Sequence, residues 1–156
     1  MFVRFYDCRQ RYTEGFLKEY KHWVLEISYL QHTLGSFIVF AKRKGVENIS
    51  DLKAEEILEL PGVMREMEVA LNRHPVFRPD KINYWQMGNV VRYLHFHGIP
   101  RYRKKRRFDG RIWYDKTFGR VPIWSKQEVE ADLVRRIRDE IGRELSKVNQ
   151  LPKGKR

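Results

Sequence analysis

The chain has few of the features that would place it outside the cell or in a membrane. It has 156 residues and a single cysteine, Cys8, which excludes an intramolecular disulfide and a zinc site built on cysteines. No apolar run approaches the ~18 residues of a membrane span. The first residues, Met1 to Tyr6, lack the apolar core of a secretory signal. We therefore expect a cytoplasmic protein without a membrane partner.

Acidic residues are outnumbered by basic ones. The chain carries 32 Lys and Arg against 20 Asp and Glu, a net charge of +12. Six cations crowd into the seven positions from Arg101 to Arg107, and Lys153, Lys155 and Arg156 lie at the end of the sequence. A solvated loop and a frayed tail would explain these clusters, and so would attraction for nucleotide phosphates or nucleic acid. Charge alone does not separate these possibilities.

The apolar pattern predicts four strands. Apolar runs indicate strands over 22–30 and 34–41, which suggest an antiparallel hairpin. Alternating apolar residues predict a third strand over 81–87 and a fourth around residues 93–97. The segment 103–124 is rich in Gly, Arg and aromatic residues, and we expect it to be irregular.

Two helices complete the predicted domain. The first is expected over about 54–73, where Pro61-Gly62 predicts a kink or two abutting helices. The second is expected to begin at the capping box Ser125-Lys126-Gln127-Glu128 and to bury an apolar stripe that ends at Leu145. The prediction is an α+β fold, an antiparallel sheet of about five strands with a kinked helix and a C-terminal helix. Residues 1–21 would form an N-terminal arm, 22–148 the domain and 149–156 a basic disordered tail.

The segment Tyr93 to Tyr102, which reads YLHFHGIPRY, carries the strongest functional signal. On a strand, alternation places Leu94 and Phe96 on one face and His95 and His97 on the other, together with Tyr93. Imidazole titrates nearest to neutrality, so such a pair can act as nucleophile, proton carrier or metal ligand.

Two simpler interpretations compete with catalysis at these histidines. A catalytic zinc needs a third protein ligand, which His22, His32 or His74 could supply only through the tertiary fold, so we expect no metal and no cofactor. A solvent-facing pair without a role is the other interpretation. The surrounding Asn83, Gly88, Asn89 and Arg101 weaken it, because small, polar and cationic groups are expected around a phosphate.

The segments 81–84 and 88–102 together resemble the signature of the histidine triad (HIT) family, which is His-φ-His-φ-His-φ-φ with φ apolar. Thr33-Leu34-Gly35-Ser36 and Val46 to Leu52 are similar to bacterial and archaeal members related to diadenosine polyphosphate hydrolases. The likeness covers roughly residues 22–145. The first histidine of the triad is replaced by Tyr93.

The resemblance implies a homodimer with sheets joined edge to edge. It also implies a nucleotide hydrolase that cleaves a phosphoanhydride or phosphoramidate through a covalent nucleotidyl-His95 intermediate. His97 would contact the reacting phosphate. The expected substrate-binding residues are Asn83, Asn89, Tyr93, Ser36 and Arg101.

Two other functions fit the same sequence. A basic module that binds nucleotides or nucleic acid, with weak or lost catalysis, would explain the +12 charge and the missing first histidine. A nucleic-acid deadenylase would hold a strand with the segment from Arg101 to Arg107 and remove the nucleotide with His95. The sequence does not choose between this activity and hydrolysis of a small nucleotide.

Overall fold

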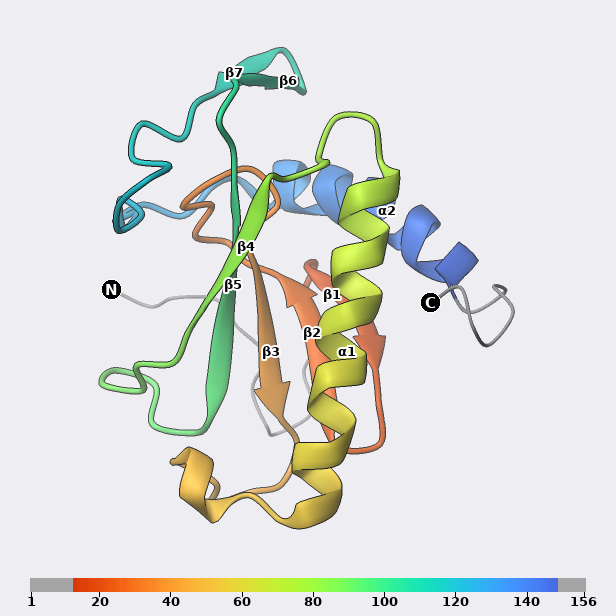
Figure 1. The fold of residues 1–156 in the computed structure, drawn as a ribbon, viewed down its shortest axis with the longest axis vertical. Coiled ribbons are helices and arrows are strands. Elements are labelled where there is room, and N and C mark those ends of the chain that lie inside the picture. Colours follow the sequence, from red (N-terminus) through yellow and green to blue (C-terminus); the bar gives the residue numbers. More distant parts are fainter. Residues whose placement is uncertain (1–12, 149–156) are drawn as a thin grey trace.

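The computed structural model describes residues 13–148, which form one antiparallel sheet, a small hairpin and two long helices (Figure 1). The sheet contains five strands in the order β1-β2-β3-β5-β4. Their bounds are Phe16–Glu19 for β1, Trp23–Ile27 for β2, Phe37–Ala41 for β3, Lys81–Trp85 for β4 and His95–Arg101 for β5. The predicted α+β class and the sheet of about five strands are confirmed.

The fifth strand is β1, which lies in the segment predicted to be an N-terminal arm. It pairs antiparallel with β2, and its register shifts between Phe16 and Lys18. Its four residues are half-buried or exposed and only weakly apolar, so periodicity did not reveal it. Residues 1–12 and the predicted tail 149–156 lie outside the described residues.

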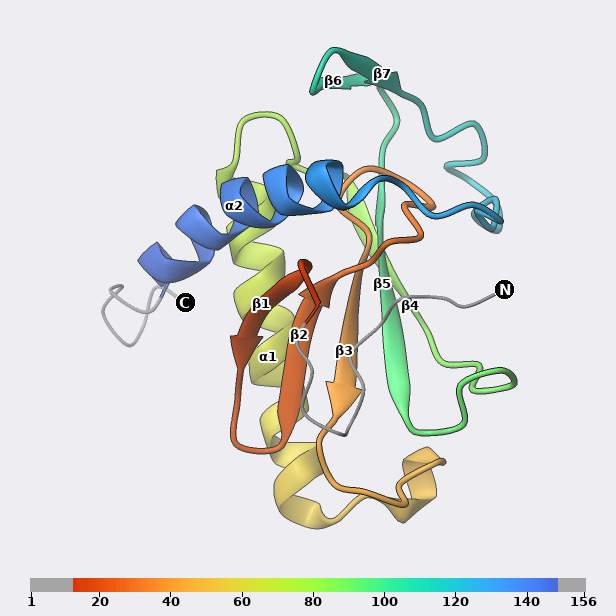
Figure 2. The same cartoon turned by 180° about the vertical axis from the view of Figure 1, so that it is seen from behind.

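Both long helices pack on the same face of the sheet. Helix α1 spans Ala54–Arg73 and buries Val63, Met67, Ala70 and Leu71, while α2 spans Ala131–Val148. Their apolar faces join inward-facing strand residues such as Leu25 and Val39 in one core cluster. Figure 2 shows α2 running crosswise to α1 near one end of the sheet. Neither helix within residues 13–148 is long and apolar enough to cross a bilayer.

Each helix departs from its prediction in one respect. Pro61 lies inside α1, which is one continuous element rather than two abutting helices. The capping box prediction at Ser125 is wrong, because α2 begins at Ala131. The Ser125 hydroxyl donates to the carbonyl of Gln127, and the Val129 amide donates to the carbonyl of Tyr29. These contacts hold residues 125–129 as a connecting loop.

The segment 103–124 is also more ordered than predicted. It contains a hairpin of β6 (Arg106–Phe108) and β7 (Arg111–Trp113) that stands away from the sheet at one end of the molecule (Figure 1). The connecting residues Asp109 and Gly110 have φ of 54° and 70°. Positive φ at both central residues is typical of a type I′ turn, for which Asp-Gly is a preferred sequence. A short 3-10 helix, η1 (Ile49–Asp51), precedes α1.

Gly98 in β5 makes room for the side chain of Phe37, its pairing partner in β3. A Cβ atom at this position would lie 2.1 Å from Phe37 Cζ, inside the core. The close neighbour of Gly98 is therefore a side chain of β3.

We expect Gly98→Ala to lower the free energy of unfolding by about 1–3 kcal/mol, because the added methyl group overpacks the site against Phe37. Urea unfolding followed by circular dichroism would measure the change. Gly119→Ala is the matched control, since a Cβ atom added at Gly119 would have no neighbour within 4 Å. Equal stability of the two variants would contradict the packing argument.

Candidate active site

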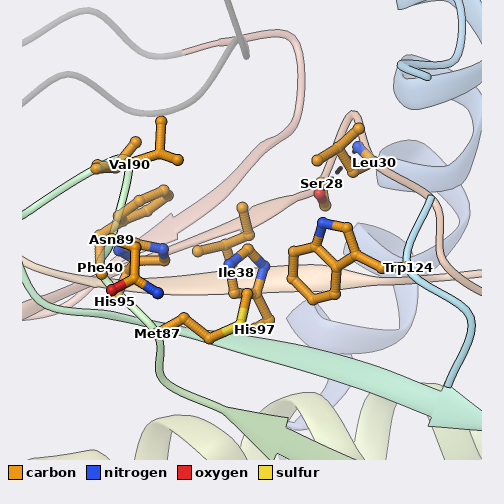
Figure 3. Close-up of a pocket in the computed structure, with 12 residues that line it drawn as sticks. Ser28, Leu30, Ile38, Phe40, Met87, Asn89, Val90, His95, His97 and Trp124 are labelled. Carbon is orange, nitrogen blue, oxygen red and sulfur yellow. Dashed lines mark hydrogen bonds between the residues drawn. The ribbon is translucent and has the colours of Figure 1, made fainter. Parts of the chain in front are cut away.

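A cavity of about 240 Å³ lies on the face of the sheet opposite the helices (Figure 3). The loop before β5 forms one side, and Trp124, from the loop before α2, forms the other. Most of its wall is apolar, and the polar groups at its surface are those of Ser28, Asn89, His95 and His97. A concave, mostly apolar pocket with a few convergent polar groups is the usual form of a small-molecule site.

The register of β5 against β3 places the two histidines side by side. Phe40 pairs with His95 and Ile38 pairs with His97. The two imidazole rings are 4.9 Å apart, and both side chains are buried. Leu94 and Phe96 point to the opposite face and join the main core. The predicted division of this segment into two faces is therefore present in the structure.

The main chain determines which nitrogen of His95 carries the proton. His95 Nδ1 lies 2.9 Å from the carbonyl oxygen of Tyr93. A carbonyl only accepts hydrogen bonds, so Nδ1 must be the protonated nitrogen and Nε2 keeps a free lone pair. Burial lowers the pKa of His95 below its usual value. At neutral pH, His95 is thus a neutral imidazole with an available nucleophilic nitrogen.

His97 is still more strongly held in the neutral form. Burial lowers its pKa to about 3, and the neighbouring His95 and His32 add to this effect. Its Nδ1 is buried and has no hydrogen-bond partner among residues 13–148. Because a negative charge would favour protonation, we expect a bound phosphate to raise the pKa of His97.

A third imidazole, His32, lies beside this pair and was not predicted as a site residue. Its ring is 6.0 Å from that of His97, and the ring of Trp124 stacks on it at 3.9 Å. His32 Nδ1 accepts a hydrogen bond of 2.9 Å from the Ser125 amide. Burial lowers its pKa to about 4. The sequence singled out His32 only as a candidate metal ligand, because its contact with residues 124 and 125 depends on the tertiary fold.

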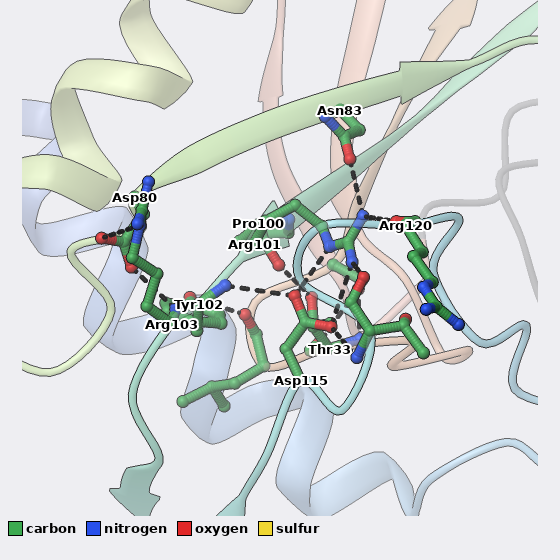
Figure 4. A network of polar contacts seen from close by, with 12 residues as sticks. Thr33, Asp80, Asn83, Pro100, Arg101, Tyr102, Arg103, Asp115 and Arg120 are labelled. Carbon is green, nitrogen blue, oxygen red and sulfur yellow. Dashed lines mark hydrogen bonds and ion pairs between the residues drawn. The ribbon is translucent and has the colours of Figure 1, made fainter.

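Arg101 and Asn83, two predicted substrate contacts, are instead bonded to each other outside the cavity (Figure 4). Arg101 has five N–H donors, and the structure uses all five. They are donated to both carboxylate oxygens of Asp115, to Asn83 Oδ1 and to the carbonyls of Thr117 and Arg120. The side chains of Arg101 and Asp115 are each 2% exposed. Arg101 therefore anchors the segment that leads to Trp124 and has no donor left for a phosphate.

The other predicted contacts lie in three different places. Asn89 lines the cavity. Ser36 is buried in a turn, where its hydroxyl donates to the Thr33 carbonyl and accepts from the Thr33 amide. Tyr93 packs on Phe40, with ring centres 5.6 Å apart, and meets His95 at 6.2 Å. Of the three, only Asn89 faces the cavity directly.

Among residues 13–148, no three His, Cys, Asp or Glu side chains are grouped so that they could hold a metal ion. The three imidazoles lie in a row, with His95 beside His97 and His97 beside His32, and the first two line the cavity.

Comparison with known proteins identifies a matching domain family and structures of the same fold. Residues 33–104 match the family model of the HIT domain, which includes both histidines. A hypothetical histidine triad nucleotide-binding protein from Sulfolobus tokodaii has the same fold, with a TM-score of 0.67, 17% identity and coverage of 86% of this chain and 85% of that one. A Hit-like protein involved in cell-cycle regulation from Bartonella henselae also has this fold, with a TM-score of 0.65 and 16% identity. The match covers 88% of this chain and 90% of that one.

A diadenosine triphosphate hydrolase from Plasmodium falciparum also shares the fold, with a TM-score of 0.58, 15% identity and coverage of 88% of this chain and 78% of that one. No curated protein matches the chain. The resemblance to the HIT family found in the sequence is thus confirmed by the domain match and by the fold. At these identities the solved structures support the fold alone.

We expect the free energy of unfolding to fall as the pH drops below 6.5, in part because of His97. Its folded pKa is about 3, whereas an unfolded histidine titrates near 6.5. Between these values the unfolded chain binds more protons, so stability is complete above this window and is lost as the pH falls through it. Within this window, replacing His97 with glutamine should make the free energy of unfolding less dependent on pH. The slope of that free energy against pH should fall by up to about 1.4 kcal/mol per pH unit.

Urea titrations of both proteins from pH 4.5 to 8 would measure these slopes. Above pH 7 the two slopes should coincide, because His97 is then neutral in both states; this range serves as the internal control. Identical slopes below pH 6 would contradict the assignment.

Proposed function

We propose that the protein is a nucleotide hydrolase that cleaves a phosphoanhydride or phosphoramidate, such as that of a diadenosine polyphosphate or an adenylylated compound. The observation that carries the proposal is the state of His95, a buried neutral imidazole whose Nε2 lone pair is free beside a mostly apolar, partly open cavity. A neutral imidazole is a competent nucleophile near pH 7. The apolar walls, among them Ile38, Phe40 and Val90, suit a nucleoside.

The proposed reaction has two displacement steps. His95 Nε2 attacks the phosphorus atom that bears the nucleoside, and the bond from phosphorus to the leaving group breaks with its electron pair. The modified imidazole keeps the proton on Nδ1 and is cationic, so the Tyr93 carbonyl at 2.9 Å stabilises it. Water then attacks phosphorus and releases one proton to solvent, the N–P bond breaks with its electron pair returning to Nε2, and His95 regains its neutral form as the nucleotide leaves.

The proposed role of His97 is to stabilise the reacting phosphate. Its ring is 4.9 Å from that of His95 on the same face of the sheet, and the approach of an anion would favour its protonation. Asn89, which lines the cavity from the loop before β5, is proposed to bind ribose or phosphate oxygens. Tyr93 contributes chiefly through its main-chain carbonyl.

The decisive experiment combines turnover with isolation of the intermediate. The protein is incubated with diadenosine tetraphosphate and with an adenylyl phosphoramidate, and quenched samples are mapped by mass spectrometry for a nucleotide on His95. His95→Gln should lower turnover by at least about 10³-fold, because the nucleophile is lost. Tyr93→Phe, the matched control at the neighbouring position, should keep most of the activity, because the carbonyl that orients His95 remains.

Turnover that persists in His95→Gln would contradict the mechanism. Tight nucleotide binding without turnover in the wild-type protein would favour the binding module with lost catalysis. Cleavage of an adenylylated oligonucleotide in preference to both small substrates would favour the deadenylase.

We also propose a homodimer joined at β4. This strand and β1 are the two edges of the sheet, and edge strands offer unpaired backbone groups to another chain. The register of β1 is irregular, whereas β4 pairs regularly with β5 along all five of its residues. Light scattering after size exclusion should give twice the chain mass of 19.0 kDa. A mass of one chain would contradict the proposal.

A further inference from the structure

We propose that the segment 103–120, which includes the β6–β7 hairpin, is a binding surface for single-stranded nucleic acid. The stretch 101–120 is about an eighth of the chain but carries nine cations against two aspartates, a net charge of +7 out of +12. The cations are Arg101, Arg103, Lys104, Lys105, Arg106, Arg107, Arg111, Lys116 and Arg120. This surface does not depend on catalysis by His95.

Several of these cations remain available at the surface. Arg101 and Asp115 are buried and neutralise each other. Arg103 and Arg111 are exposed and have acidic neighbours in Asp80 and Glu130. The exposed side chains of Lys104, Lys105, Arg107 and Lys116 make no ion pair within residues 13–148. Charges of one sign held this close repel one another, and a polyanion relieves that repulsion.

The fold keeps these charges together. The type I′ turn at Asp109 and Gly110 closes the hairpin, and the buried Arg101–Asp115 pair closes its base. Arg106 donates to the carbonyls of Lys104, Lys105 and Arg78, which fixes the basic loop before β6. Figures 1 and 2 show the hairpin projecting from one end of the molecule, beyond the end of the sheet. The surface is thus preorganised rather than a solvated run of charges.

Aromatic side chains among the cations indicate which polyanion fits. Tyr114 is 54% exposed, and the Lys105 ammonium lies 5.3 Å from its ring centre. The Arg103 guanidinium lies 4.8 Å from the ring of Phe118. Proteins that bind single strands without sequence preference combine a basic path for the backbone with aromatic rings on which bases stack. Exposed rings beside the cations therefore favour a ligand that carries both phosphates and stacking bases.

Fluorescence anisotropy with labelled 20-nucleotide single-stranded DNA and RNA tests the surface on the full chain. The variant Lys104→Glu, Lys105→Glu, Arg107→Glu removes three of its free cations. The matched control Lys21→Glu, Lys44→Glu, Arg65→Glu makes the same change of net charge at exposed positions elsewhere. We expect the first variant to lose at least about tenfold in affinity and the control to lose little.

Two further measurements separate backbone contacts from stacking. The slope of log affinity against log salt should become shallower by about 2 in the first variant, if each cation meets one phosphate. Tyr114→Ala should lower affinity about tenfold while leaving that slope unchanged. His95→Gln should bind as the wild type does, so failure of the proposed hydrolysis would leave this surface intact.

Four outcomes would overturn the proposal. The first is failure of the wild-type protein to bind, and the second is an equal loss of affinity in both triple variants. The third is loss of binding in His95→Gln. The fourth is unchanged affinity of the Lys104, Lys105, Arg107 triple variant while its molar mass in solution is halved. The last would show that the surface joins copies of this chain. Unfolding curves for every variant establish that each one is folded.

Discussion

The buried pair of Arg101 and Asp115 anchors both the cavity wall and the basic hairpin. Taking two charges out of water is costly, and the cost is offset only when every donor and acceptor finds a partner. Arg101 meets that condition, because all five of its N–H groups are bonded. Its contacts with Thr117 and Arg120 start the chain on its path to Trp124, and Asp115 closes the base of the hairpin. One ion pair thus positions the cavity wall and the basic surface.

The centre of the site depends on main-chain geometry more than on the side chain at position 93. The register of β3 and β5 brings His95 and His97 together, and the carbonyl of Tyr93 determines the tautomer of His95. Any residue at this position supplies that carbonyl. This explains how tyrosine can stand where the family resemblance implies histidine while His95 keeps its orientation.

Local patterns explain which parts of the structure were predictable. Period-two alternation located the histidine strand and its two faces, and four-residue spacing located the apolar stripe of α2. Strand β1 was not predicted because its residues are mixed in polarity. The hairpin was not predicted because its Asp-Gly turn is flanked by cations rather than by alternating apolar residues. His32 and Trp124 carry no local signal. Only tertiary contacts, such as that between His32 and Ser125, bring them to His97.

The fate of Arg101 shows why a run of like charges cannot be interpreted as one unit. The sequence placed it with its basic neighbours as a phosphate contact, but its burial makes it structural, while Lys104, Lys105 and Arg107 stay exposed. The histidines in the cavity are neutral at pH 7, because burial lowers each pKa. Long-range attraction of an anion must then come from the cations outside the cavity. Such attraction raises the rate of encounter and weakens with salt, whereas the proposed displacement needs His95 as a neutral imidazole.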